Sequence, residues 1–198
     1  ISNLVLGGHK QMNDITRGYD GLRAMGVKIV QGEVARIDAA GKKVRLADGS
    51  ELPYDRLILS PGIDFMFEQV GGLKAAVDAG QVQHSWKADP QTVALRRQLE
   101  AMPDGGVFAM SIPKVPYRCP PGPYERACLV ADYFKRVKGA GAKVIILDEN
   151  ASIQAEVETF THAFNTLHAG VIDYRPGVSG LAIDPDTRVV RYLDPVGQ

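Results

Sequence analysis

The sequence has little cysteine, no excess of charge and no long apolar run. Its 198 residues include two cysteines, Cys119 and Cys128, which are too few for a disulfide scaffold or a zinc site. The 23 basic and 23 acidic residues leave a net charge of zero, so nothing favours binding to nucleic acid or to an anionic membrane. No stretch approaches the roughly 20 apolar residues of a membrane span. These absences exclude classes of protein and leave the compartment open.

The first residues, ISNLVLGGHKQ, lack the charged start and apolar core of a secretory signal. They also lack an initiating methionine. We therefore expect the chain to be an internal piece of a longer protein. Hydrophobic residues make up 45% and charged residues 23%, which is ordinary for a globular chain.

Turn signals divide the first third of the chain. Residues 12–25 predict a short helix that Asp14 caps and Gly26 ends. Residues 27–62 predict a small antiparallel sheet, because AAGKK and ADGS are turn sequences and Val44 and Leu46 alternate with charged residues. The apolar run RLILS before Pro61-Gly62 predicts a buried return strand.

Residues 106–176 follow the order strand, loop, helix, strand, helix, strand. A helix should precede them, with Asp89 as its N-cap and Pro90 in its first turn. Strands separated by helices of this length predict parallel pairing with right-handed crossovers. We therefore predict an α/β fold with a doubly wound, Rossmann-like sheet and helices on both sides. The last residues predict a hairpin around Pro185-Asp186.

The turn after the first of these strands is unusual for a Rossmann unit. A dinucleotide-binding domain needs a glycine-rich turn there, so that the pyrophosphate can meet a helix N-terminus. This sequence has IPKVPYRCPPGPYER instead, whose prolines remove N–H donors. The loop therefore argues against NAD(P) binding. Asp148 and Glu149, at the position of a ribose-binding acid, are interpreted as a solvated strand end.

Cys119 is the distinctive residue of this loop. Arg118 and the N-terminus of the following helix would both favour a thiolate there, but an inert cysteine is an equally open alternative. Glu125 is interpreted as an acid that complements the helix dipole, and the alternative is that it moves protons near a reactive sulfur. Cys128 lies on the apolar face of the helix and is predicted to be a core residue. The histidines suggest no metal site, since His162 and His168 do not share a helix face.

The run YRCPPGPYERACLVADYFK resembles the signature of the flavoprotein subunits of flavocytochrome c sulfide dehydrogenases. The segments GYDGLRAMGVKIVQGEVARID, YDRLILSPGIDF and SWKADPQTVALRRQLEAMPDGGV resemble further parts of that family. The resemblance implies a flavoprotein with two dinucleotide-binding domains, related to sulfide:quinone oxidoreductases and glutathione reductases. In that family the first domain holds FAD, and the second keeps the Rossmann shape without using NAD.

The resemblance also implies roles for individual residues. Cys119 falls on the first cysteine of the family's redox disulfide, and Glu125 on a glutamate that assists proton transfer. Segments near the cofactor fall on Val34 and on Ser60, Pro61, Gly62 and Ile63. The family's second redox cysteine would lie beyond Gln198. Its glycine motif for the FAD pyrophosphate and its FAD-attaching cysteine have no counterpart here.

The expected parent enzyme is a periplasmic sulfide dehydrogenase. Sulfide would attack the redox disulfide, and electrons would pass to FAD and then to a c-type cytochrome subunit. Residues 1–65 would end the first FAD-domain segment, 66–180 would form the NAD-like domain, and 181–198 would begin the return to the FAD domain. We expect this chain alone to be inactive and not to retain FAD. The alternatives are a sulfide:quinone oxidoreductase, an NADH-linked disulfide oxidoreductase, and an inactive structural module.

Overall fold

A computed structural model describes residues 2–84, 86–139 and 141–198. The chain divides into two compact units. The larger consists of Ile1–Thr16 and Met66–Gln198, and the smaller of Arg17–Phe65. The assignment of residues 1–65, 66–180 and 181–198 to an FAD domain and an NAD-like domain stays a prediction.

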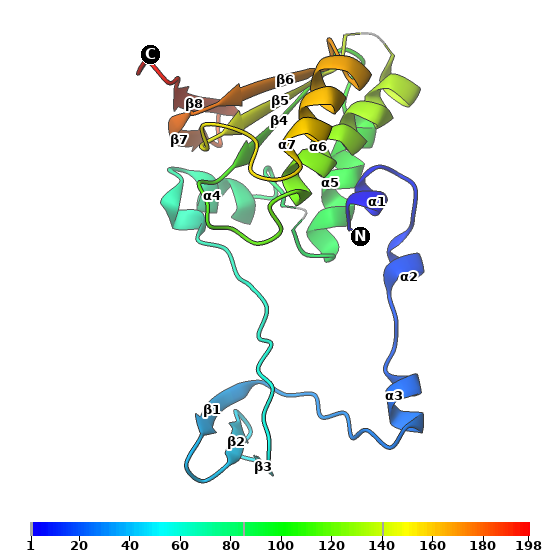
Figure 1. The fold of residues 1–198 in the computed structure, drawn as a ribbon, viewed down its shortest axis with the longest axis vertical. Helices are drawn as coiled ribbons and strands as arrows, with labels where there is room; N and C mark the ends of the chain where they lie inside the picture. The colour runs from blue at the N-terminus through cyan, green and yellow to red at the C-terminus, as the bar shows by residue number, and fades with distance from the viewer. Residues whose placement is uncertain (1, 85, 140) are drawn as a thin grey trace. The chain divides into compact units, whose positions relative to one another are not determined.

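A three-stranded parallel sheet forms the centre of the larger unit (Figure 1). Its strands are β4 (Val107–Ile112), β5 (Lys143–Asp148) and β6 (Ile172–Pro176), in the order β4-β5-β6. The two connections run through α6 (Gly122–Tyr133) and α7 (Val157–His162), which continue as the π-helical turns η2 (Phe134–Lys138) and η3 (Ala163–Leu167). The sheet confirms the predicted strand–helix alternation and parallel pairing.

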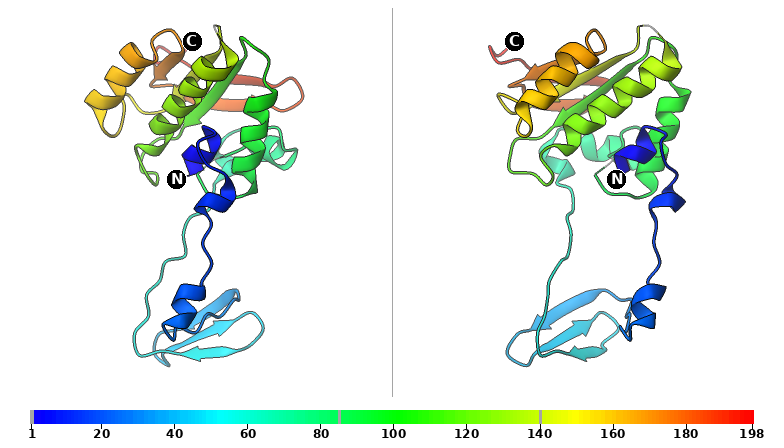
Figure 2. Two further views of the ribbon diagram at one scale, coloured as in Figure 1. Left: turned by 90° about the vertical axis from the view of Figure 1, so that its right-hand side faces the viewer. Right: turned by 45° about the vertical axis from the view of Figure 1, so that its right-hand side comes forward.

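The two faces of this sheet are covered by different kinds of element. Val144 and Ile146 of β5 are fully buried in a cluster to which α5, α6 and α7 contribute. Leu147, one residue further along the same strand, packs instead with Val178 and Leu181. The opposite face therefore meets the hairpin of β7 (Ser179–Asp184) and β8 (Val189–Leu193), as the views of Figure 2 show.

The prediction of helices on both sides of the sheet is therefore wrong. The strands follow one another across the sheet in sequence order. Two right-handed crossovers that advance in the same direction place their helices on the same face. The predicted hairpin after residue 180 is confirmed, and it covers the second face of the sheet, where helices were predicted.

Two further helices complete the helical face. α5 (Pro90–Ala101) begins as predicted, because the Asp89 carboxylate accepts a hydrogen bond from the backbone N–H of Gln91 at 2.9 Å. α1 (Ser2–Leu6) lies beside α5 and α6 (Figure 1). Its Leu6 is fully buried in the same cluster as Leu99. On the hairpin side, α4 (Leu73–Asp78) follows the short helix η1 (Phe67–Gln69) and packs against β7.

The smaller unit is the predicted antiparallel sheet. It contains β1 (Val34–Asp38), β2 (Lys43–Leu46) and β3 (Glu51–Pro53), preceded by α3 (Asp20–Ala24). Val44 and Leu46 are buried and alternate with exposed Lys43 and Arg45, as the sequence pattern predicts. The α/β fold with a parallel sheet preceded by a small antiparallel one is thus confirmed.

Two local predictions for the first third of the chain are wrong. The helix predicted over residues 12–25 is interrupted: α2 (Met12–Ile15) and α3 are separate, and Gln11 rather than Asp14 is the N-cap. Residues 56–60 form no strand, and Ile58 is 91% exposed. A strand needs a hydrogen-bonded neighbour, and no described strand pairs with this segment. Among the helices that the structure describes, none is long and apolar enough to cross a membrane.

Candidate functional site

Cys119 lies in the loop between the end of β4 and the start of α6, as predicted. Its side chain is exposed and its φ is +60°, a left-handed conformation that costs a non-glycine residue about 1–2 kcal/mol. The loop closes where the Gly122 N–H donates to the Cys119 carbonyl at 2.9 Å. A Cβ at Gly122 would lie 3.2 Å from the Cys119 sulfur, so a glycine leaves room for the thiol there.

Aromatic side chains hold this loop from one side. The Trp86 indole donates from Nε1 to the Arg118 carbonyl at 2.9 Å. Its ring meets Tyr117 edge-on, with 5.9 Å between ring centroids. The Arg126 guanidinium stands over the same indole, 5.0 Å from its centroid, which is within the range of a cation–π interaction. Trp86 therefore contacts the backbone next to Cys119 and a buried cation at once.

Arg126 is the charged group that sequence reasoning missed. The side chain is 7% exposed, and burial lowers its pKa to about 10, against the opposing effects of Cys119 and Glu125. It therefore keeps its charge at neutral pH. Arg118, the predicted source of positive charge beside Cys119, is exposed. Position 126 lies one turn before the buried Val130 of α6, and that spacing was the available signal.

Glu125 lies in the first turn of α6 with its side chain exposed. Asn3 donates from Nδ2 to the Glu125 carboxylate and to the Gly122 carbonyl, at 3.3 Å each. Cys119 and Glu125 both act electrostatically on the Arg126 guanidinium and raise its pKa, against the larger opposite effect of burial.

Asp148 does not lie at a solvated strand end, and that interpretation is wrong. Its carboxylate is fully buried. One oxygen accepts from the Tyr124 hydroxyl at 2.8 Å and from the Tyr174 hydroxyl at 3.0 Å. The other accepts from the backbone N–H and the side-chain amide of Asn150, at 2.9 and 2.8 Å. The pKa of both tyrosines is raised, first by burial and also by Asp148. Tertiary hydrogen bonding overrides the usual exposure of an acid at a strand end.

This buried network also anchors the start of the cysteine loop. Asn150 donates from Nδ2 to the Pro113 carbonyl at 3.0 Å, and the Val115 N–H donates to Asn150 Oδ1 at 3.0 Å. Glu149, the neighbouring acid, is half-buried, and burial raises its pKa with a smaller contribution from Asp148. Asp148 therefore supports the loop, which leaves the ribose-binding interpretation without support from its geometry.

Cys128 is a core residue, as predicted. It packs against the main hydrophobic cluster. Burial raises the pKa of its thiol to about 11, and Glu125 adds to the effect. A thiol of this kind is a poor nucleophile at neutral pH. Of the two cysteines, only Cys119 is exposed.

The residues predicted to lie near a cofactor belong to the smaller unit. Val34 begins β1 and is 53% exposed. Ser60, Pro61 and Gly62 are exposed, and Ile63 is half-buried. Gly62 has a φ of +84° and open space where a Cβ would point. None of the described backbone hydrogen bonds uses residues 60–63, and their predicted place near a cofactor stays a prediction.

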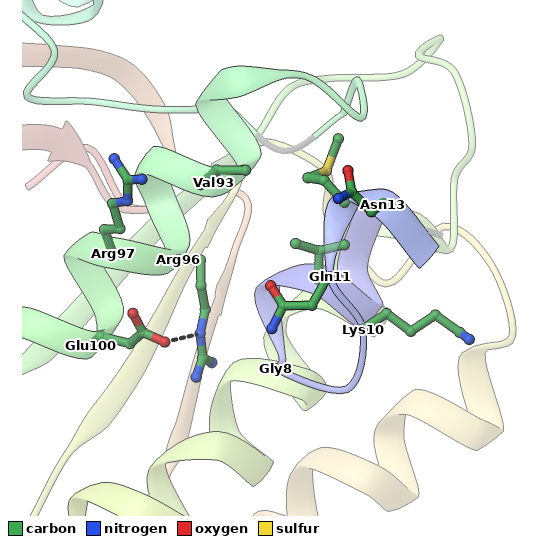
Figure 3. A pocket seen from close by; sticks show the side chains of 10 residues that line it. Gly8, Lys10, Gln11, Asn13, Val93, Arg96, Arg97 and Glu100 are labelled. Carbon is green, nitrogen blue, oxygen red and sulfur yellow. Dashed lines mark hydrogen bonds and ion pairs between the residues drawn. The ribbon is translucent and has the colours of Figure 1, made fainter. Parts of the chain in front are cut away.

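A separate pocket of about 390 Å³ opens between α5 and the segment from Gly8 to Asn13 (Figure 3). Its lining includes Lys10, Arg96 and Arg97, and Arg96 is paired with Glu100 at 2.7 Å. It contains no thiol. No three His, Cys, Asp or Glu side chains gather as a metal site anywhere in the described part of the chain.

Comparison with known proteins gives a family match and a fold. A model of the family described as "Sulfide dehydrogenase [flavocytochrome c] flavoprotein chain, central" matches residues 92–194. The structure resembles a sulfide:quinone oxidoreductase from the hyperthermophilic bacterium Aquifex aeolicus, with a TM-score of 0.74 and 18% sequence identity. All of this chain is covered by that match, but only 46% of the other.

A second similar structure is a chain of the Tetrahymena thermophila mitochondrial ATP synthase, with a TM-score of 0.54 and 13% identity. This chain spans 51% of its length. At these identities the two likenesses show the fold alone.

Proposed function

The chain belongs to the family of flavocytochrome c sulfide dehydrogenase flavoprotein chains, and on this premise we propose that Cys119 is the redox cysteine at which its parent protein oxidises sulfide. The observation that carries the proposal is the exposed Cys119 thiol, in a loop that Trp86 joins to the buried cation Arg126. The other cysteine, Cys128, lies against the core.

The chemistry proposed for Cys119 is thiol–disulfide exchange. In the oxidised enzyme, Cys119 would share a disulfide with a second cysteine of the parent protein. A hydrosulfide ion attacks one sulfur, a new S–S bond forms, and the old S–S bond breaks. One cysteine then carries a persulfide and the other leaves as a thiolate, so charge and electrons balance. Glu125 would take or return the proton that accompanies these steps.

FAD is the cofactor proposed for the parent protein. Val34, Ser60, Pro61, Gly62 and Ile63 would contact it, mainly through main-chain atoms. When bound, FAD would supply a group that can take up two electrons together and release them one at a time. The acceptor proposed from the family name is a c-type cytochrome subunit. We place the enzyme in the periplasm, where a disulfide can persist.

The loop before α6 favours this function over an NADH-linked reductase. Its prolines leave no glycine nest for a pyrophosphate, and Asp148 is occupied by two tyrosines and Asn150. The resemblance to a sulfide:quinone oxidoreductase shows a shared fold and does not by itself favour a quinone as acceptor.

A pair of serine variants in the intact flavoprotein tests the proposal. Cys119→Ser should abolish bleaching of the flavin absorbance by sulfide, because the disulfide and its nucleophilic sulfur are lost. Cys128→Ser should leave bleaching near the wild-type rate and lower stability slightly. Bound flavin should be equal in both. If Cys119→Ser still bleaches at near the normal rate and Cys128→Ser does not, the proposal is wrong.

A further inference from the structure

Arg126 combines deep burial with a contact to Trp86, the side chain that also binds the backbone next to Cys119. Within the described part of the chain it is the only basic side chain that is buried. Removing a guanidinium from water is unfavourable unless other groups compensate for the lost hydration. The Trp86 ring, 5.0 Å below the guanidinium, supplies part of that compensation. Cys119 and Glu125 also raise the pKa of Arg126, against the effect of burial.

One indole fixes both the cation and the thiol loop. Trp86 binds the Arg118 carbonyl, directly before Cys119, through its Nε1–H. The face of the same ring carries Arg126. The distance between charge and thiol therefore depends on a packed aromatic side chain and not on a flexible surface arginine. A buried charge is also screened less by salt than a surface charge.

We propose that Arg126 is a substrate-positioning residue, whose charge draws the hydrosulfide anion to Cys119 and offsets the negative charge that develops on sulfur when the disulfide opens. This inference rests on the proposed function, since it assigns a role within the same reaction. It replaces the exposed Arg118 as the source of positive charge at the thiol.

Two alkylating reagents that differ in charge test this without any sulfide turnover. Iodoacetate is an anion and iodoacetamide is neutral, and both are attacked by the same thiolate. The ratio of their rates at Cys119 therefore reports the local charge and cancels the amount of thiolate. In the full chain under reducing conditions, this ratio should exceed that of a small model thiol. A ratio equal to or below the model thiol's would overturn the inference.

Three variants locate the charge. Arg126→Gln should lower the ratio about fivefold or more, the effect of losing one unit charge at short range in partly screened surroundings. Arg126→Lys should keep it within about twofold of wild type, because the charge is retained. Arg118→Gln, the matched surface control, should also leave it nearly unchanged. If the ratio fell in Arg118→Gln but not in Arg126→Gln, the charge at the thiol would come from Arg118, and the inference would be wrong.

Cys128 reports whether each variant is folded. Its thiol should label slowly in every folded variant, because it is half-buried with a raised pKa. If Cys128 is labelled rapidly in Arg126→Gln, that variant is not properly folded. The ratios of the wild type, Arg126→Lys and Arg118→Gln then decide whether the inference holds. The result is separable from the proposed function. If the alkylation ratio shows no effect of Arg126, the bleaching experiment on Cys119→Ser still tests the proposed function. If Cys119→Ser bleaches normally, the alkylation ratio still reports the charge near Cys119.

Discussion

At the scale of single residues, Asp148 shows how a buried charge supports a reactive loop. Its carboxylate accepts four hydrogen bonds, from Tyr124, from Tyr174 and two from Asn150. Asn150 in turn forms hydrogen bonds with the backbone of Pro113 and Val115 at the start of the loop. Because a buried carboxylate is favourable only when its lone pairs are satisfied, the whole set should behave as a unit.

Asp148→Ala should therefore lower the free energy of unfolding by about 3–5 kcal/mol, the usual cost of breaking a buried charged network. Urea denaturation of the purified chain measures this. Asp186→Ala is the control, since that carboxylate is exposed and should change stability by no more than about 0.5 kcal/mol. Equal midpoints for the two variants would contradict the role assigned to Asp148.

Single residues also mark where sequence reasoning reached its limit. Asp89 as a helix cap and Cys128 as a core position were predictable, because caps and helix faces depend on near neighbours in sequence. The partners of Asp148 and Arg126 were not. Tyr174 is 26 residues from Asp148 in sequence, and Trp86 is 40 positions before Arg126. Such contacts arise only once the sheet and its helices have assembled.

At the scale of elements, the turn into α4 depends on a glycine. Gly72 has a φ of +75°, and a Cβ there would lie 1.8 Å from the Ile183 carbonyl oxygen of β7. The Ile183 N–H also donates to the Gly71 carbonyl at 2.7 Å. The backbone of Gly71 and Gly72 therefore packs directly against the backbone of Ile183. An added Cβ would meet main-chain atoms, which cannot move aside as a flexible side chain could.

Gly72→Ala should destabilise the chain by roughly 3 kcal/mol or more, since both the conformation and the contact are disrupted. Gly105→Ala is a matched control, because Gly105 has the same φ of +75° but no atom within 4 Å of the added Cβ. It should cost only about 1 kcal/mol of backbone strain. Thermal unfolding of both variants measures the difference, and similar losses would refute the close approach.

The elements themselves were mostly predictable, and their layering was not. The alternation of strands and helices from residue 106 to 176 follows from local patterns of apolar and turn residues. Which side each helix covers depends on the order of strands in the sheet. The sequence pattern shows that Ile145 and Leu147 are apolar, but it does not indicate whether a hairpin or a helix covers them. Residues 56–60 read as a buried strand, although no described strand pairs with them.

At the scale of the whole molecule, the apolar core is unevenly divided between the two units. Val44 and Leu46 are the only buried apolar side chains of residues 17–65, a stretch that the structure describes throughout. That unit also exposes large apolar side chains, among them Tyr19, Met25 and Ile58. The larger unit holds both hydrophobic clusters. Stability increases with the apolar area that is buried, so the two units should differ strongly in the free energy needed to unfold them.

Hydrogen exchange should resolve this difference strand by strand. Amides of β5, which lies between two strands with Val144 and Ile146 fully buried, should open only with the whole larger unit. Amides of β1, whose five side chains are all exposed, should exchange at least about 100-fold faster, because a small sheet with little burial opens by itself. The β7–β8 hairpin provides the internal control. It is two-stranded but packs on Leu147, so its protection should fall between the two. Equal protection of β1 and β5 in the purified chain would mean that residues 17–65 are stabilised by more than Val44 and Leu46.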